Sequence, residues 1–295
     1  RRAARHRDGR RHRAAADVAG SDLVGVVEER REVVVRVHEG PHDVRAVGDH
    51  GNRGFPLPAA EYPVPTFSWG VIAGDLDRDG DLDLVVATLS GFATLLNRGD
   101  GTFAAFENTI LMEGGPVAPI KLTDVNRDGA LDLVIPARGV PLLLNRGDGT
   151  FLEPTNLRPG LDPWSLQVAD FDLDGAMDIA ITWRASNRDF LSILLNRGIA
   201  GFANPVDYEN TEGWLIVGAW DLDNDFDPDV VLTGINTVSV MLNRGDGSLA
   251  EPMTFLTDWP GMSIHAGDFD DDGDVDLVTA DHNETTILFN NLIRQ

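Results

Sequence analysis

The sequence GDLDRDGDLDLVVA, residues 74–87, sets the pattern for most of this chain. Aspartates occupy positions 1, 3, 5 and 9 of a nine-residue turn that starts at Asp75, and a run of apolar, largely β-branched residues follows. The same arrangement returns in residues 123–136, 169–182, 219–233 and 267–280. The first aspartates of successive copies are 49, 46, 51 and 47 residues apart, a spacing typical of propellers and related repeat arrays.

A second motif keeps step with the first. It reads LLNRGDGTF at residues 95–103 and recurs with small changes at 143–151, 194–202 and 241–249, with a shortened form, ILFNN, at 287–291. Asn, Gly and Asp are the residues that a tight turn requires, so we interpret this motif as a turn between strands. In the first unit we expect strands at 67–74, 83–88 and 93–97 and a fourth strand beginning at Thr102. Four strands in each unit predict an all-β fold, a β-propeller of four-stranded blades.

The repeats divide the chain into two parts. Residues 55–295 are predicted to be the β-propeller repeat domain, with five clear blades starting near residues 66, 115, 161, 212 and 259. Residues 1–54 match poorly, because they hold 12 of the 24 basic residues and 5 of the 7 histidines and contain no Asp-rich loop.

Three interpretations of residues 1–54 remain open. The segment can be a frameshifted blade, since the codons of Arg-Arg-His-Arg read one base later can encode residues such as Asp-Gly-Ile-Asp. It can be a basic leader, or a degenerate sixth blade with strands at 24–27 and 32–37. Each interpretation predicts a poorly ordered segment.

Composition excludes several classes of partner. The formal net charge is −24, with 48 acidic against 24 basic residues, so nucleic acid and anionic membrane surfaces would repel the chain. No apolar run reaches the roughly 18 residues of a membrane span. Zero cysteines exclude disulfides and thiolate metal sites. We therefore expect no nucleic-acid partner and no membrane span, and we expect either a monomer or a fragment of a larger chain.

The Asp-rich loops predict metal binding. Several carboxylates held this close would repel one another unless a cation lay between them. Ca²⁺ accepts about six to eight oxygen ligands in flexible geometry, whereas Mg²⁺ demands a strict octahedron and Zn²⁺ or Cu²⁺ favour nitrogen or sulfur. An EF-hand is excluded, because position 12 is Val86 rather than Glu and a strand-like run follows instead of a helix.

We therefore expect about five structural Ca²⁺ ions, each bound at positions 1, 3, 5 and 9 of one loop. The predicted ligands are Asp75, Asp77, Asp79 and Asp83 in loop 1; Asp124, Asn126, Asp128 and Asp132 in loop 2; Asp170, Asp172, Asp174 and Asp178 in loop 3; Asp221, Asp223, Asp225 and Asp229 in loop 4; and Asp268, Asp270, Asp272 and Asp276 in loop 5. Loop 4 departs from the others. Phe226 replaces the position 6 glycine and Pro228 stiffens the turn, so we expect a distorted or weak site there.

The two motifs together resemble a known repeat. The D-x-D-x-D-G-x-x-D-L-V loop and the N-x-G-D-G-T-F turn are similar to the FG-GAP or VCBS-type repeat of secreted bacterial proteins, which is related to the repeats of integrin α-subunit propellers and some fungal lectins. The resemblance covers about residues 55 to 295. It implies a calcium-binding propeller, commonly of seven blades, in a family that includes adhesins, lectins and accessory domains of enzymes.

Tryptophans recur before the metal loops. Trp69 and Trp164 lie six residues before the first Asp of their loops, and Trp214 lies seven before. Such side chains can bind a ligand by stacking on sugar rings or on an apolar patch of a partner. They can equally pack between blades, which is the commoner role of large apolar residues at equivalent places in a repeat.

Catalysis has little support in the sequence. His265 and His282 are the only histidines of the repeat region, no G-x-S-x-G motif occurs, and cysteine nucleophiles are absent. We therefore expect no enzyme but a non-catalytic calcium-binding module of an exported protein, extracellular or at the cell surface, that presents its propeller faces to a carbohydrate or protein. The alternative is a catalytic or substrate-holding propeller in polysaccharide degradation.

Overall fold

The protein is seen here in a computed structural model. It describes residues 23–291 apart from 29–30, 38–42, 49–59, 64–67, 89–90, 105–106, 111–119, 159, 199–200, 211–212, 214–215, 258–260, 262 and 281–284. The secondary-structure elements in this part of the chain are all β-strands, which confirms the all-β prediction. No helix long and apolar enough to cross a membrane occurs there.

The strands form six antiparallel sheets, each with its strands paired in chain order. The leading sheet contains β1 (Leu23–Glu28), β2 (Arg31–Val37), β3 (Asp43–Gly48) and β4 (Ala60–Pro63). Blade 1 contains β5 (Ser68–Gly74), β6 (Asp83–Thr88), β7 (Gly91–Leu95) and β8 (Glu107–Ile110). Blade 2 contains β9 (Lys121–Thr123), β10 (Asp132–Val134), β11 (Pro141–Leu143) and β12 (Thr155–Asn156).

Three more blades follow in the same order. Blade 3 contains β13 (Pro163–Ala169), β14 (Asp178–Ala185), β15 (Arg188–Leu194) and β16 (Val206–Asn210). Blade 4 contains β17 (Ile216–Trp220), β18 (Asp229–Thr233), β19 (Thr237–Met241) and β20 (Met253–Leu256). Blade 5 contains three strands in the described residues, β21 (Ser263–Gly267), β22 (Asp276–Ala280) and β23 (Thr285–Leu288).

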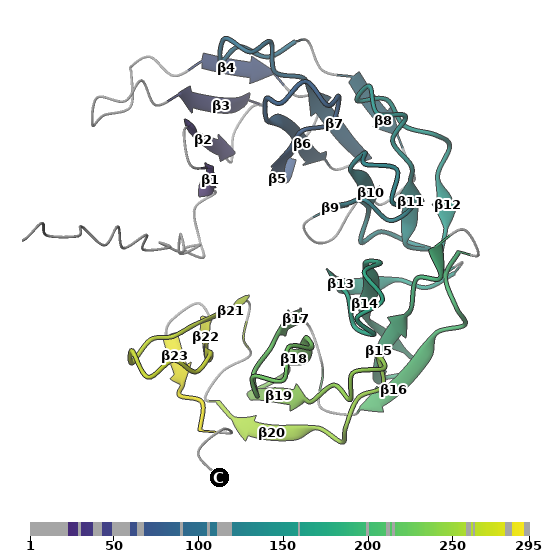
Figure 1. The fold of residues 1–295 in the computed structure, drawn as a ribbon, viewed down its shortest axis with the longest axis vertical. Coiled ribbons are helices and arrows are strands. Elements are labelled where there is room, and N and C mark those ends of the chain that lie inside the picture. The colour runs from purple at the N-terminus through teal and green to yellow at the C-terminus, as the bar shows by residue number, and fades with distance from the viewer. Residues whose placement is uncertain are drawn as a thin grey trace, which may run out of the picture.

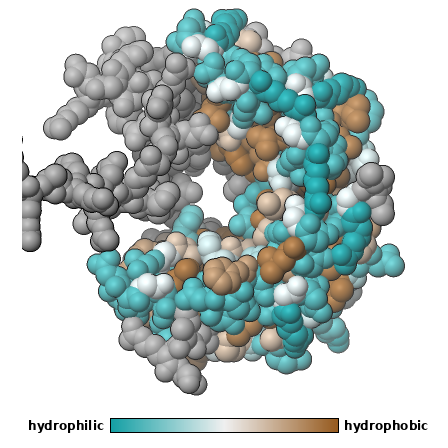
Figure 2. Space-filling model, viewed as in Figure 1, coloured by the Kyte–Doolittle hydropathy of each residue, from teal (hydrophilic) through white to brown (hydrophobic). Residues whose placement is uncertain are grey.

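The six sheets stand around a central opening as an incomplete ring (Figure 1). The first strands of blades 1 to 5 face the opening and contact one another in sequence, and the fourth strands form the outer rim. The leading sheet and blade 5 lie on the two sides of the gap in the ring. In the same view, much of the outer rim is hydrophilic and hydrophobic residues gather beside the opening (Figure 2).

The leading sheet bears on the interpretation of residues 1–54. Its first two strands coincide with the strands of the degenerate-blade interpretation, and the sheet includes residues on both sides of position 54. Residues 1–22, which carry most of the Arg-rich sequence, lie outside the described residues. The division at residue 54 and the nature of the leader therefore stay predictions.

Within blade 1 the predicted second strand is β6, with the same bounds. The prediction of a fourth strand beginning at Thr102 is wrong. Phe103 forms only an isolated bridge with Asn97, and β8 begins at Glu107. The physical reason is local, since the Asp100 carboxylate accepts hydrogen bonds from both the N–H and the hydroxyl of Thr102 and so prolongs the turn.

The hydrophobic core is divided among the interfaces between successive sheets. One cluster joins blades 1 and 2 around Leu76 and Leu133, another joins blades 3 and 4 around Phe171 and Val230, and similar clusters fill the other interfaces. The second strands are buried on both faces, which is why they read as continuous apolar runs. Burying each such side chain contributes about 1.5–3 kcal/mol.

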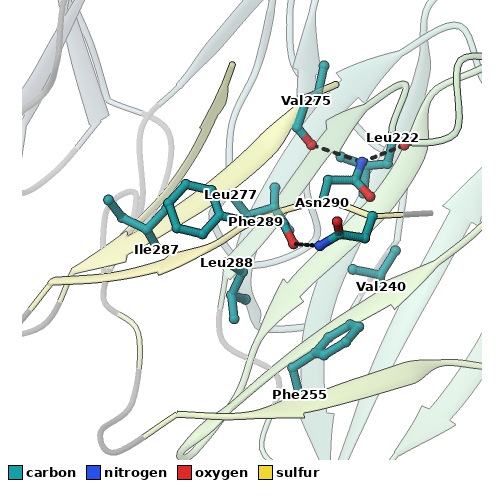
Figure 3. A pocket seen from close by; sticks show the side chains of 10 residues that line it. Leu222, Val240, Phe255, Val275, Leu277, Ile287, Leu288, Phe289 and Asn290 are labelled. Atoms are coloured by element: carbon teal, nitrogen blue, oxygen red, sulfur yellow. Dashed lines mark hydrogen bonds between the residues drawn. The ribbon is translucent and has the colours of Figure 1, made fainter. Parts of the chain in front are cut away.

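One interface is less filled than the others. In blade 4 the turn residue Leu249 is buried and its N–H donates to the Tyr208 hydroxyl of the preceding blade, as Phe103 donates to Tyr62. Between blades 4 and 5 no described residue takes this place. A cavity of about 390 Å³ opens there between Phe255 of β20 and Leu288 of β23 (Figure 3).

Candidate functional site

Each Asp-rich loop connects the first and second strands of its blade, and hydrogen bonds fix all five in one conformation. The position 1 carboxylate accepts the N–H of position 6 at 2.7–3.1 Å in every loop. The position 5 carboxylate accepts the N–H of position 7 at 2.7–3.1 Å in every loop. These bonds curl the chain so that the side chains at positions 1, 3 and 5 converge.

The backbone of loop 4 follows the others, so the expected distortion is not found. Positions 4 and 6 adopt left-handed backbone conformations in all five loops, and Phe226 does so with a φ of 74°. For a residue with a Cβ atom this conformation costs about 1–2 kcal/mol. The Phe226 side chain is 85% exposed, so little packing offsets that cost. The substitution thus destabilises loop 4 without changing its shape.

The position 9 aspartate is fully buried in every loop. One of its oxygens accepts the N–H of position 2 at 2.8–3.0 Å, and the other accepts the N–H of the turn asparagine at 2.6–2.8 Å. Burial nevertheless raises the pKa of Asp83, Asp132 and Asp178 to about 6 and that of Asp229 to about 7. A cation beside the loop would favour the charged form.

Carboxylate oxygens meet at the same place in four of the five blades. Groups of three that can hold a metal ion have their ligand atoms within 4.8 Å of one another: Asp75, Asp77 and Asp83; Asp170, Asp172 and Asp178; Asp221, Asp223 and Asp225; Asp268, Asp270 and Asp276. Loop 2 forms no such group in the described residues, because Asn126 supplies an amide at position 3. The structure therefore brings together most of the predicted ligands, and their role as ligands stays a prediction.

A metal ion fits these groups for a second reason. Oδ1 of Asp75, Asp172, Asp223 and Asp227 is buried and has no hydrogen-bond partner among the described residues. A buried carboxylate oxygen without a partner is costly, and a cation would remove that cost. Burial and the neighbouring Asp225 also raise the pKa of Asp223, as burial and Asp79 raise that of Asp77. Oxygen-only donors in flexible loops suit Ca²⁺.

The turn asparagine is a structural residue that sequence reasoning missed. In blades 2 to 5 its Nδ2 donates to the position 2 carbonyl of the preceding blade, at 2.6–2.8 Å, and to the position 8 carbonyl of its own loop. Figure 3 shows this pair of bonds for Asn290. The asparagine therefore connects neighbouring blades in addition to shaping the turn. Its recurrence in phase with the loops was the available signal.

Of the three predicted tryptophans, the structure describes the side chain of one. Trp69 lies in β5, but its side chain is outside the described part of the structure, as is the whole of Trp214. Trp164 lies in β13 at the end away from loop 3, and its side chain is 46% exposed. Trp164 is therefore a surface residue, and its role in ligand binding stays a prediction.

A charged side chain lies over the Trp164 ring. The Arg184 guanidinium lies 5.8 Å from the Trp164 ring centroid and forms two hydrogen bonds, of 2.6 and 2.9 Å, with the buried Asp189. In the neighbouring cross-strand pair Trp183 stacks on Phe190, with ring centroids 4.5 Å apart, and Trp183 packs against the core cluster between blades 2 and 3. Arg184, Asp189, Trp183 and Phe190 belong to the β14–β15 hairpin, and β14, with 8 residues, is the longest strand of blades 1 to 5.

Comparisons with known proteins agree with this architecture. A lectin of Agrocybe aegerita, described as specifically recognising non-reducing terminal N-acetylglucosamine, has a similar structure, with a TM-score of 0.64 and 20% identity over 92% of this chain and 78% of the lectin. The V. cholerae biofilm matrix protein Bap1 is similar with a TM-score of 0.52 and 15% identity, over 84% of this chain but only 41% of Bap1. At these identities the likeness shows the fold alone.

A search of curated protein sequences gives no match. The family model described as FG-GAP-like repeat matches residues 75–135, 136–181 and 221–279, which together are more than half of the chain. These segments contain all five loops, so the match covers the same motifs that carried the resemblance. The chain belongs to the FG-GAP-like repeat family.

Proposed function

We propose that this chain is a non-catalytic calcium-binding module of an exported protein and that it binds carbohydrate through a propeller face. One observation carries the proposal most directly: carboxylate oxygens converge within 4.8 Å at the same place in four of the five blades. A binding module of this kind needs no catalytic group.

Calcium has a structural role in this proposal. About five ions, one for each loop, would be held by the aspartates at positions 1, 3, 5 and 9, with Asn126 supplying an amide oxygen in loop 2. Bound Ca²⁺ supplies positive charge that offsets the repulsion among these carboxylates. The loops in turn fix the start of each second strand and, through the turn asparagine, the contact with the neighbouring blade.

An extracellular location is part of the proposal, and calcium chemistry supports it. Extracellular modules use weak calcium sites, with dissociation constants of about 10⁻⁴ to 10⁻³ M, because the ion is abundant outside cells. Bap1, one of the structural neighbours, is a biofilm matrix protein. Both points support export of this chain.

The surface around Trp164 is the proposed carbohydrate-binding place. An exposed indole gives a flat apolar face on which a sugar ring can stack. The Arg184 guanidinium lies over this ring and donates to Asp189, so the pair offers polar groups beside the indole. The lectin neighbour, which recognises a terminal N-acetylglucosamine, supports a sugar as the ligand.

The test is binding of the calcium-loaded chain to a panel of oligosaccharides that includes chains ending in N-acetylglucosamine. We expect binding by the unaltered protein, at least a tenfold loss in Trp164→Ala, and no loss in the control Leu256→Ala, which truncates a side chain that is 86% exposed on β20. Binding that survives Trp164→Ala unchanged would place the sugar elsewhere. Absence of binding to every glycan, with calcium bound, would exclude carbohydrate as the ligand.

A further inference from the structure

Two arginines connect the acidic loops of successive blades. Arg78, at position 4 of loop 1, donates through Nη2 to the backbone oxygen and to Oδ1 of Asp128 in loop 2, at 2.9 and 3.0 Å. Arg127, at position 4 of loop 2, makes the same two bonds to Asp174 in loop 3, at 2.8 and 3.0 Å. In both cases a guanidinium group lies against the position 5 carboxylate of the next loop.

A third arginine enters loop 3 from its own blade. Arg197 donates through Nη1 to Oδ2 of Asp172 at 2.6 Å, and the Asp172 side chain is only 8% exposed. In the turns of blades 2 and 4 the matching side chain points elsewhere, since Arg146 and Arg244 donate at 2.7 Å to the backbone oxygens six residues after their turn asparagines. Loop 3 therefore has two of its predicted metal ligands paired with cationic side chains.

Loop 4 has the opposite character. The residue at position 4 of loop 3 is Leu173, which is 53% exposed. It has no charged group, so it cannot form the ion pair to the next loop that Arg78 and Arg127 form. No ion pair reaches a loop 4 carboxylate from the described residues. Loops 1, 4 and 5 each carry a fifth carboxylate at position 7, which is Asp81, Asp227 and Asp274, respectively. Asp227 is 3% exposed, and its Oδ1 and that of Asp223 are both buried without a hydrogen-bond partner.

A cation beside a carboxylate competes with a metal ion for the same oxygen atoms and makes the site less negative. Calcium affinity in oxygen sites depends strongly on the number of charged ligands. In the described residues loop 4 has two buried carboxylate oxygens without a hydrogen-bond partner, whereas loops 1 and 3 have one each. We infer from this that loop 4 is the tightest calcium site of this protein and that Arg197 and Arg127 make loop 3 the weakest of the four carboxylate groups. The inference rests on the proposed calcium binding, and it reverses the expectation that Phe226 weakens loop 4.

The test counts bound ions on the full chain as free Ca²⁺ is raised from a chelated start, by equilibrium dialysis or native mass spectrometry. Two matched variants change position 3 in the same way, Asp223→Asn in loop 4 and Asp172→Asn in loop 3. We expect Asp223→Asn to weaken the first ion by about tenfold or more, and Asp172→Asn to leave that ion unchanged.

A third variant keeps the test informative if either aspartate variant folds poorly. Arg197→Gln removes a half-exposed cation and keeps the turn, and we expect one weakly bound ion to tighten by about tenfold while the first ion is unaffected. Loss of the tightest ion in Asp172→Asn, or unchanged affinities in Arg197→Gln, would overturn the ranking of the sites. The proposed calcium binding itself would still stand. An unaltered chain that takes up no ion refutes the proposed calcium binding as well.

Discussion

The turn asparagine gives the sharpest test of how the blades are joined. Asn196 is 1% exposed, and its Nδ2 donates to Val125 O of blade 2 at 2.7 Å and to Met177 O at 3.2 Å. Its Oδ1 accepts the N–H of Gly198 at 3.0 Å. Asn196→Ala removes all three bonds. At about 1 kcal/mol for each bond, we expect the free energy of unfolding to fall by about 3 kcal/mol.

Asn97→Ala is the matched control. In the described residues Asn97 bonds only within blade 1, to Leu82 O and to the N–H of Gly99, so two bonds are lost and about 2 kcal/mol is expected. Urea unfolding at saturating calcium measures both variants. We also expect a broader transition in Asn196→Ala, because a weakened contact between repeats lowers cooperativity. Equal losses and equal breadths for the two variants would refute the assignment of Asn196 to the blade interface.

Two further predictions concern the loops. Because the folded pKa values of the position 9 aspartates in loops 1 to 4 are raised from 3.8 to about 6 or 7, the chelated protein should lose stability as pH rises from about 4 to about 7. Calcium should cancel this fall in melting temperature, and a chelated protein that gains stability over that range contradicts the pKa shifts. Phe226→Gly should stabilise the chain by about 1 kcal/mol by relieving the left-handed backbone, whereas Gly175→Ala, at a φ of 84°, should destabilise it in the same thermal assay.

Much of this architecture could be predicted because each repeat unit contains local motifs that locate its strands. The Asp loop and the apolar run after it locate the first and second strands, and the Gly-rich turn locates the third. The leading sheet was only one of three open interpretations, because its residues lack both motifs. The start of the fourth strand was misplaced for a local reason, since the Asp100 side chain extends the turn beyond Thr102.

The parts that escaped prediction are contacts between repeats. Arg78 and Asp128 are 50 residues apart in sequence, and Asn196 and Val125 are 71 apart. Nothing in the local pattern indicates which blade a side chain will reach. Phe226 was misleading in a different way. Its effect on the backbone was visible in the sequence, but the sequence did not show that arginines pair with carboxylates of loops 2 and 3 and, in the described residues, with none of loop 4.

The asparagine bonds between blades all point one way along the chain. In every case the donor belongs to the later blade and the acceptor carbonyl to the earlier one. A ribosome, or a secretion channel that delivers the amino end first, would therefore present each new blade to a neighbour whose acceptor is already in place. The ring can thus assemble one blade at a time from the amino end, with each new blade bonded to the one before it.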